Sequence, residues 1–197
     1  MIDNEKIDAI IVASSWTSID KIIIPLLKHK IPCFIEKPLA TDTFLLKKLE
    51  NIISQKKLIT MVGFQSRFHP CVQETKRVLC ENEFGKVVSA HFNWSTYLPD
   101  HHLYEDFKQG YAARTELGGG VIFCLSHELD LIQLFFRQPN TVYAVEGGKS
   151  KLDLEVEDTV TALFCCGDKT RPFPVSIRLS FAQGLEKRKF EILMENS

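Results

Sequence analysis

Short apolar runs alternate with amphipathic stretches in the first part of the chain. Residues 7–13 form an almost continuous β-branched run, and residues 33–35 and 58–64 are two further short apolar segments. Such runs are typical of strands buried on both faces of a parallel sheet. Apolar positions at helical spacing predict a helix after each of the first two runs, with Pro25 kinking or shortening the first helix. The order strand, helix, strand, helix, strand predicts an α/β fold with a parallel, helix-covered sheet.

The pattern changes after Gly63. Pro70 suits the first turn of a helix that runs to about Glu81. Apolar and polar side chains then alternate over residues 87–97, as in a half-exposed strand of an antiparallel sheet. The next segment, residues 98–117, is polar, aromatic and irregular, and a long loop of this kind inside a domain is usually functional.

Glycines 118–120 open an apolar stretch that predicts one helix reaching about Phe136. Strand-like segments follow at residues 141–146, 159–165 and 174–181, and another begins near Lys189. We therefore expect two domains, residues 1–62 with the parallel sheet and residues 63–197 with helices and a mostly antiparallel open sheet. The chain begins on an apolar strand and stops near another, so we expect both domains to be truncated, and we expect poor solubility or oligomerisation through exposed strand edges.

Composition and charge restrict the function. The chain has 197 residues, 45% of them hydrophobic, and a formal net charge of −1, so a nucleic-acid partner is not expected. The basic run 187–189 is short and is interpreted as a solvated face. No apolar run approaches the roughly 18 residues of a membrane span, and the opening residues do not resemble a signal peptide, so we expect a cytoplasmic protein with no membrane partner. The six cysteines contain no Cys-x-x-Cys pair and are interpreted as structural, with only one of Cys165 and Cys166 in the core.

The first group of candidate site residues is Glu36-Lys37-Pro38, at the carboxyl end of a predicted parallel strand. Ligands of open α/β sheets bind at that edge. A lysine there can hold a substrate hydroxyl and stabilise the alkoxide that precedes hydride loss. Taken alone, a charged pair before a proline is equally compatible with an ordinary strand end.

The second group follows the three glycines, where His127 and Asp130 share one face of the predicted helix. Glycine permits close backbone approach at the start of the helix. Histidine is the natural general base for a hydroxyl proton near neutral pH, and the aspartate could hold a substrate hydroxyl or orient the imidazole. A hydrogen-bonded core histidine is the structural alternative.

The loop at 98–117 carries aromatic, acidic and basic groups of the kind that bind sugars. Its candidate substrate residues are His102, Tyr104, Tyr111 and Arg114. Two neighbouring histidines with acids nearby could also suggest a metal, but no pair has zinc-like spacing with a third ligand, so we predict no metal site.

Taken in order, these motifs resemble the Gfo/Idh/MocA oxidoreductases over practically the whole chain. The matching segments are residues 8–13, Glu36-Lys37-Pro38, residues 62–70, residues 84–87, and the glycines followed by His127-x-x-Asp130. The resemblance implies a Rossmann domain that binds NAD or NADP. It also implies a second domain whose open sheet forms the substrate site and often the oligomer interface. The expected reaction is oxidation of a secondary alcohol on a sugar, polyol or sugar nucleotide, and the expected partner is a second copy of the chain.

The resemblance also implies roles for individual residues. Lys37 would bind the nicotinamide ribose region and the substrate hydroxyl, with Glu36 beside it at the cofactor. His127 would be the acid/base and Asp130 a substrate contact. The further residues implied at the cofactor are Ser14, Ser15, Trp16 and Arg67.

The chain departs from the family pattern in several places, two of which bear directly on function. It has no Gly-x-Gly-x-x-Gly turn, the element that binds the cofactor pyrophosphate at a helix N-terminus, so we expect cofactor affinity to fall steeply. Many members carry an aspartate shortly before the histidine, where this chain has Phe123 and Cys124, so no Lys-Asp-His triad is expected. The alternative function is therefore that of a non-catalytic truncated fragment, either a pseudogene product or a half that binds sugar or a sister subunit, or of one half of a split enzyme.

Overall fold

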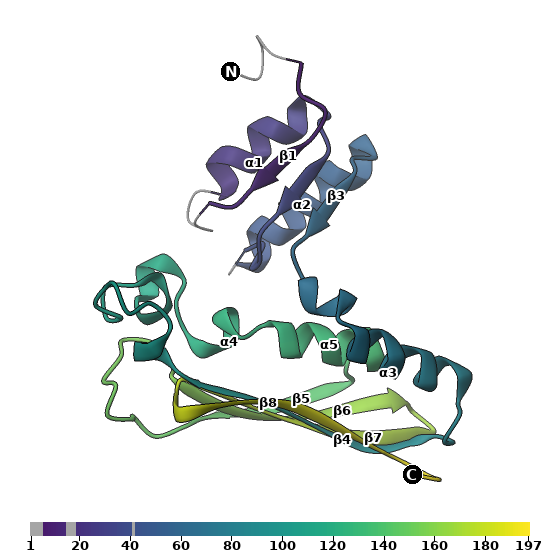
Figure 1. Ribbon diagram of the computed structural model, residues 1–197. Helices are drawn as coiled ribbons and strands as arrows, with labels where there is room; N and C mark the ends of the chain where they lie inside the picture. Colours follow the sequence, from purple (N-terminus) through teal and green to yellow (C-terminus); the bar gives the residue numbers. More distant parts are fainter. Residues whose placement is uncertain (1–5, 15–18, 41) are drawn as a thin grey trace. The chain divides into compact units, whose positions relative to one another are not determined.

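The computed structural model describes residues 6–14, 19–40 and 42–197, and the chain divides into two units, Met1–Phe64 and Gln65–Ser197 (Figure 1). The first unit contains a three-stranded parallel sheet in the order β1-β2-β3, as the sequence predicts. Its elements are β1 (Ile10–Val12), α1 (Ile19–Lys28), β2 (Cys33–Ile35), α2 (Thr43–Lys56) and β3 (Thr60–Val62).

The core of the first unit lies on one face of this sheet. Val12 and Ile35 pack there with Ile23 and Leu27 of α1 and with Leu49 of α2. On the opposite face, Ile11 is 75% exposed, and its register partner Phe34 is only half-buried. The expectation of strands buried on both faces is therefore wrong for the described residues, because both helices pack on the same face.

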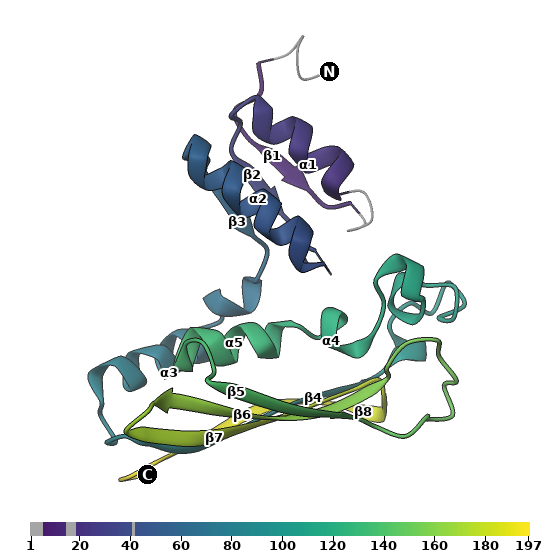
Figure 2. The ribbon, with the colours of Figure 1, turned by 180° about the vertical axis from the view of Figure 1, so that it is seen from behind.

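The second unit is a five-stranded sheet with helices along one face (Figures 1 and 2). The strand order is β5-β6-β7-β4-β8, in which only the β4–β7 pair is parallel, so the prediction of a mostly antiparallel sheet is confirmed. The strands are β4 (Val87–Tyr97), β5 (Thr141–Glu146), β6 (Thr159–Asp168), β7 (Arg171–Ser180) and β8 (Ala182–Met194). The α-helices are α3 (Pro70–Glu81), α4 (Val121–Cys124) and α5 (His127–Phe136), and the short 3-10 helices are η2 (Gln65–Phe68), η3 (Leu98–Asp100), η4 (Tyr111–Ala113) and η5 (Thr115–Leu117).

Aromatic side chains fill the space between this sheet and its helices. Phe92 of β4 is fully buried and contacts Phe135 and Phe136 of α5 and Phe190 of β8. The opposite face of the sheet carries no helix in either view of the ribbon (Figures 1 and 2). Because side chains alternate along a strand, Tyr143 of β5 and its register partner Leu163 of β6 point to that open face.

Two elements differ from their predictions. The single helix expected from the glycines to Phe136 is interrupted, because Leu125 leaves the helical conformation (φ −99°, ψ 26°) and ends α4. His127 thereby becomes the first residue of α5 instead of an interior helix residue. The last strand begins at Ala182, seven residues before Lys189, where we expected it to begin.

Among the described residues, no single helix is long and apolar enough to cross a membrane. The segments Thr115–Cys124 and His127–Phe136 together have the length and composition of a membrane span, but they are bent by 48° relative to each other. Leu131 and Ile132 of the second segment lie in the core against the sheet. All six cysteines are free thiols. Cys166 is fully buried and Cys165 is not, as the alternation of the strand predicts. Burial raises the pKa of Cys166 to about 11, and the neighbouring Cys165 makes a smaller contribution in the same direction.

Candidate functional site

The carboxyl edge of the parallel sheet gathers several of the predicted cofactor residues. Ser14 follows β1, Glu36 and Lys37 follow β2, and Gly63 follows β3. The parallel ladder continues just past the strands, since the amide of Glu36 donates to the Val12 carbonyl (2.9 Å) and the amide of Gly63 donates to the Ile35 carbonyl (2.8 Å). Ser15 and Trp16, which belong to the same prediction, lie outside the described residues.

Gly63 leaves room for the Glu36 side chain at this edge. A Cβ atom at position 63 would lie 3.0 Å from Oε2 of Glu36 and 3.1 Å from Cζ of Phe34. Glu36 itself is exposed, Lys37 is half-buried, and the Lys37–Pro38 peptide bond is cis. The carboxylate of Glu36 and the ammonium group of Lys37, adjacent in sequence, thus lie at the edge of the sheet where ligands of parallel sheets bind.

In the second unit, His127 begins α5 and is only 3% exposed. Its imidazole lies beside the indole of Trp94, with 6.1 Å between ring centroids and 36° between ring planes. The two acids in the first turn of the same helix, Glu128 and Asp130, are also buried. Three titratable side chains are therefore removed from bulk water within a single helical turn, so their charges require partners.

Asp130 finds its partner in Arg67 of η2. The guanidinium donates from Nε to Oδ2 (2.8 Å) and from Nη2 to Oδ1 (2.5 Å), a bidentate geometry. The hydrogen bond that Arg67 donates to the Asp130 carboxylate raises the pKa of Arg67, although burial opposes this. We predicted a cofactor role for Arg67 and a substrate role for Asp130, and the structure pairs the two with each other.

Glu128 finds its partner in Arg188 of β8. Nε of Arg188 donates to Oε1 of Glu128 (2.6 Å) and Nη2 donates to Oγ of Ser66 (2.9 Å). The same guanidinium lies over the ring of Trp94 at 4.1 Å, within the range of a cation–π contact. Nε1 of Trp94 donates to Oε1 of Glu186 (2.9 Å).

Arg188, Trp94 and Glu128 are site residues that the sequence analysis missed. We interpreted the run 187–189 as a solvated face, and all three residues are exposed, but Arg188 also pairs with the buried Glu128. Strand alternation places Arg188 on the helix-covered face, opposite Trp94 in the β4–β8 register, whereas the exposed lysines on either side of it point away from the helices. The signal that could have found Arg188 is the period-two pattern shared with Phe190, which also faces the helices.

The three glycines let segments of the chain pack closely on one another. Gly118 ends η5 in the left-handed conformation (φ 70°). A Cβ atom at Gly119 would lie 2.7 Å from the carbonyl oxygens of Tyr111 and Ala112. At Gly120 (φ 108°) the space that a side chain would need is filled by the carboxylate of Glu157, whose Oε1 also accepts from the amide of Ile122 (3.2 Å). This packing joins the irregular loop to the start of α4.

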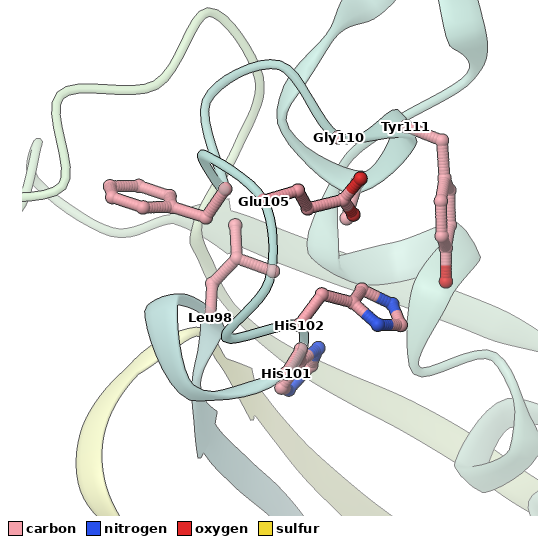
Figure 3. A pocket seen from close by; sticks show the side chains of 8 residues that line it. Leu98, His101, His102, Glu105, Gly110 and Tyr111 are labelled. Carbon is pink, nitrogen blue, oxygen red and sulfur yellow. The ribbon is translucent and has the colours of Figure 1, made fainter.

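Two of the four substrate residues predicted in the irregular loop line a pocket there. His102 and Tyr111 are there together with His101 and Glu105, and Figure 3 shows His102 and Glu105 directed toward the side on which Tyr111 stands. Tyr104 is largely exposed and is joined to His102 by a contact between its hydroxyl and Nδ1 (3.2 Å).

Outside this pocket, Arg114 forms an ion pair with Glu116. Within the pocket, burial lowers the pKa of His101, with a smaller contribution from neighbouring His102. Among the described residues, no group of three histidine, cysteine or acidic side chains is placed to hold a metal ion.

Both units match models of one oxidoreductase family. A model for the GFO/IDH/MocA C-terminal domain matches residues 72–196, and a model for an oxidoreductase family with an NAD-binding Rossmann fold matches residues 1–64. Inositol 2-dehydrogenase 2 of Saccharopolyspora erythraea is 32% identical over 92 residues, which cover 46% of this chain and 27% of that protein.

Solved structures share the fold. Myo-inositol 2-dehydrogenase from Lactobacillus plantarum superposes with a TM-score of 0.84 at 20% identity, covering 100% of this chain and 58% of its own. The WlbA dehydrogenase from Bordetella pertussis, in complex with NADH and UDP-GlcNAcA, gives a TM-score of 0.83 at 20% identity, covering 99% of this chain and 55% of its own. The chain therefore spans little more than half the length of these solved relatives. Its two matched segments together establish that the chain belongs to the Gfo/Idh/MocA family of oxidoreductases.

Proposed function

We propose that the protein is the catalytic part of an NAD(P)-dependent dehydrogenase that oxidises a secondary alcohol of a sugar, polyol or sugar nucleotide. The observation that carries this proposal is that both units match the same family. The roles of Lys37 and His127 rest on the resemblance of Glu36-Lys37-Pro38 and of His127-x-x-Asp130 to the motifs of that family. The names of the relatives agree with this substrate class, since they include inositol dehydrogenases and a dehydrogenase bound to UDP-GlcNAcA.

The residues at the sheet edge fit the nicotinamide half of the cofactor. Ser14, Glu36 and Lys37 offer a hydroxyl, a carboxylate and an ammonium group for ribose and amide groups, and Gly63 keeps the backbone accessible beside them. The sequence has no Gly-x-Gly-x-x-Gly turn to hold the pyrophosphate, so we expect weak binding by this chain alone. When bound, the nicotinamide supplies the hydride acceptor.

The protein side chains perform the acid–base part of the reaction. The imidazole of His127 accepts the proton of the reacting hydroxyl, and the ammonium of Lys37 donates a hydrogen bond to the same oxygen as negative charge develops on it. Asp130 is already bonded to Arg67 through both carboxylate oxygens, but each oxygen has a second lone pair. Asp130 can therefore accept a hydrogen bond from a substrate hydroxyl while Arg67 fixes the orientation of the carboxylate.

The open face of the five-stranded sheet is the proposed contact with a second copy of the chain. Tyr143, Val145 and Leu163 are all at least half-exposed on strands β5 and β6. An exposed apolar sheet face of this kind is a typical association surface.

We also propose that the protein is cytoplasmic and that it has neither a nucleic-acid partner nor a membrane partner.

Calorimetric titration of the purified chain with NADH and NADPH, followed by turnover assays with inositols, sugars and sugar nucleotides, tests the proposal. We expect weak but measurable nucleotide binding. We further expect Lys37→Ala and His127→Ala to lower turnover at least ~100-fold, consistent with the usual contribution of a positioned acid or base. Lys47→Ala, on the exposed face of α2, is the matched control. Absence of both binding and turnover would instead support a non-catalytic fragment or one half of a split enzyme.

A further inference from the structure

Arg188 connects four elements around His127. It extends from β8, lies on the indole of Trp94 of β4 and donates hydrogen bonds to Glu128 of α5 and Ser66 of η2. Its side chain is 36% exposed, whereas that of Glu128 is 3% exposed. The partly exposed guanidinium of Arg188 therefore neutralises a carboxylate that is almost completely buried.

We propose that Arg188 is a positioning residue for His127, acting by neutralising the buried Glu128 carboxylate and by fixing the Trp94 indole against the imidazole. The consequence for catalysis rests on the proposed function, whereas the effect on the His127 side chain does not.

Two of the carboxylates around His127 each have an arginine partner. On its own helix, Glu128 is matched by Arg188 and Asp130 by Arg67. From β8, Glu186 also faces this region and accepts the Trp94 indole N–H. From the segment before β6, the Glu157 carboxylate accepts an amide of α4. Removing Arg188 leaves one extra negative charge in a poorly solvated turn, which stabilises the protonated form of a nearby imidazole.

The Trp94 indole is held at two points. Arg188 is its direct cross-strand neighbour in the β4–β8 register and stacks on the ring, while Glu186 binds the ring nitrogen. A planar guanidinium can stack and donate a hydrogen bond simultaneously, which the ammonium of lysine cannot do. The imidazole of His127 packs against this fixed ring, so its orientation depends on the arginine.

Histidine-selective NMR of the chain measures the effect directly. The ring of His127, assigned by its loss in His127→Asn, is titrated in the wild type, Arg188→Met, Glu128→Gln and the double variant. We expect the titration midpoint to rise by about one pH unit in Arg188→Met, to fall by a similar amount in Glu128→Gln and to return near the wild-type value when both charges are removed. Arg77→Met is the matched control, because Arg77 is also ion-paired but lies on the outer side of α3 among exposed acids.

Unchanged midpoints in both single variants would overturn the proposal, and so would a rise in Arg188→Met that persists in the double variant. Glu128→Gln preserves the shape and hydrogen bonding of the side chain, so it remains informative if Arg188→Met does not fold. In a chain with turnover, the acidic limb of kcat/KM against pH should move with the NMR midpoint. Shifted midpoints in a chain without turnover would refute the proposed function and leave the positioning role of Arg188 supported.

Discussion

Arg67 and Asp130, 63 residues apart in the chain, form a bidentate ion pair with N–O distances of 2.8 and 2.5 Å. The pair joins η2, the first element of the second unit, to the first turn of α5. Its two members differ in environment, since the side chain of Arg67 is 43% exposed and that of Asp130 is 5% exposed. The carboxylate therefore depends on the arginine more than the arginine depends on the carboxylate.

This asymmetry predicts unequal effects of removing either partner. Arg67→Met leaves a buried carboxylate without its cation, and we expect it to lower the free energy of unfolding by about 2–3 kcal/mol. Asp130→Asn leaves an arginine that water already reaches, and the amide oxygen can still accept one hydrogen bond, so we expect a loss of about 1 kcal/mol. Urea unfolding of both variants provides the comparison; equal losses would contradict the dependence of Asp130 on Arg67.

The glycine run makes a second prediction. A methyl group at Gly119 would lie 2.7 Å from two backbone carbonyl oxygens, neither of which can rotate away. We expect Gly119→Ala to destabilise the second unit by about 2 kcal/mol or more, in the range of other overpacking substitutions. Gly148→Ala is the control, because no heavy atom lies within 4 Å of the position that its methyl group would take. A thermal melt of Gly119→Ala that overlays that of the control would argue against close packing here.

Local periodicity predicted most of the fold. The helix at Pro70–Glu81 and the strand at Val87–Tyr97 were both recognisable, because helix initiation at a proline and period-two alternation are encoded by neighbouring residues. The interruption at Leu125 was not predicted, because the stretch from Val121 to Leu125 is apolar and no glycine or proline marks the break; Ser126, the N-cap residue of α5, is the local signal that was overlooked. That interruption decides that His127 begins a helix.

Candidate site residues could be proposed only where a local motif marks them. Lys37 stands at the end of a strand and His127 follows a glycine run, so each could be proposed from its immediate surroundings. The pairing of Arg67 with Asp130 depends on contacts between distant segments. The alternation with Phe190 indicates which face Arg188 occupies, but its place opposite Trp94 depends on the register between β4 and β8, which no local pattern specifies.

The pocket in the irregular loop predicts a dependence of stability on pH. The imidazole of His101 packs edge-on against Phe181 and contacts Thr96 Oγ1 through Nε2 (2.9 Å). Burial lowers the pKa of His101 from its ordinary value of 6.5, so the unfolded chain takes up the proton more readily than the folded chain. The stability contributed by the neutral ring is fully present at pH values above the ordinary histidine pKa of 6.5, and it is lost as the pH falls through the lowered pKa of His101.

Urea unfolding at about pH 7.5 and about pH 5.0, on either side of the ordinary histidine pKa, measures this loss. We expect His101→Gln, which cannot titrate but can still reach the Thr96 hydroxyl, to lose less stability on acidification than the wild type. An identical loss in both proteins would assign the acid sensitivity to other groups.

The open sheet face yields the final prediction. Tyr143 is 72% exposed and Leu163 is 50% exposed, and the two are register partners on the face without helices. If a second copy covers this face, a charge there would be buried without a partner, which strongly disfavours association. We therefore expect Tyr143→Glu and Leu163→Glu each to convert the assembly to monomers in sedimentation velocity without altering the circular dichroism of the chain. Leu103→Glu is the matched control, because Leu103 is 84% exposed but lies on the irregular loop away from the sheet. Association that survives both sheet substitutions, or that is lost equally in Leu103→Glu, would place the contact between copies on another surface.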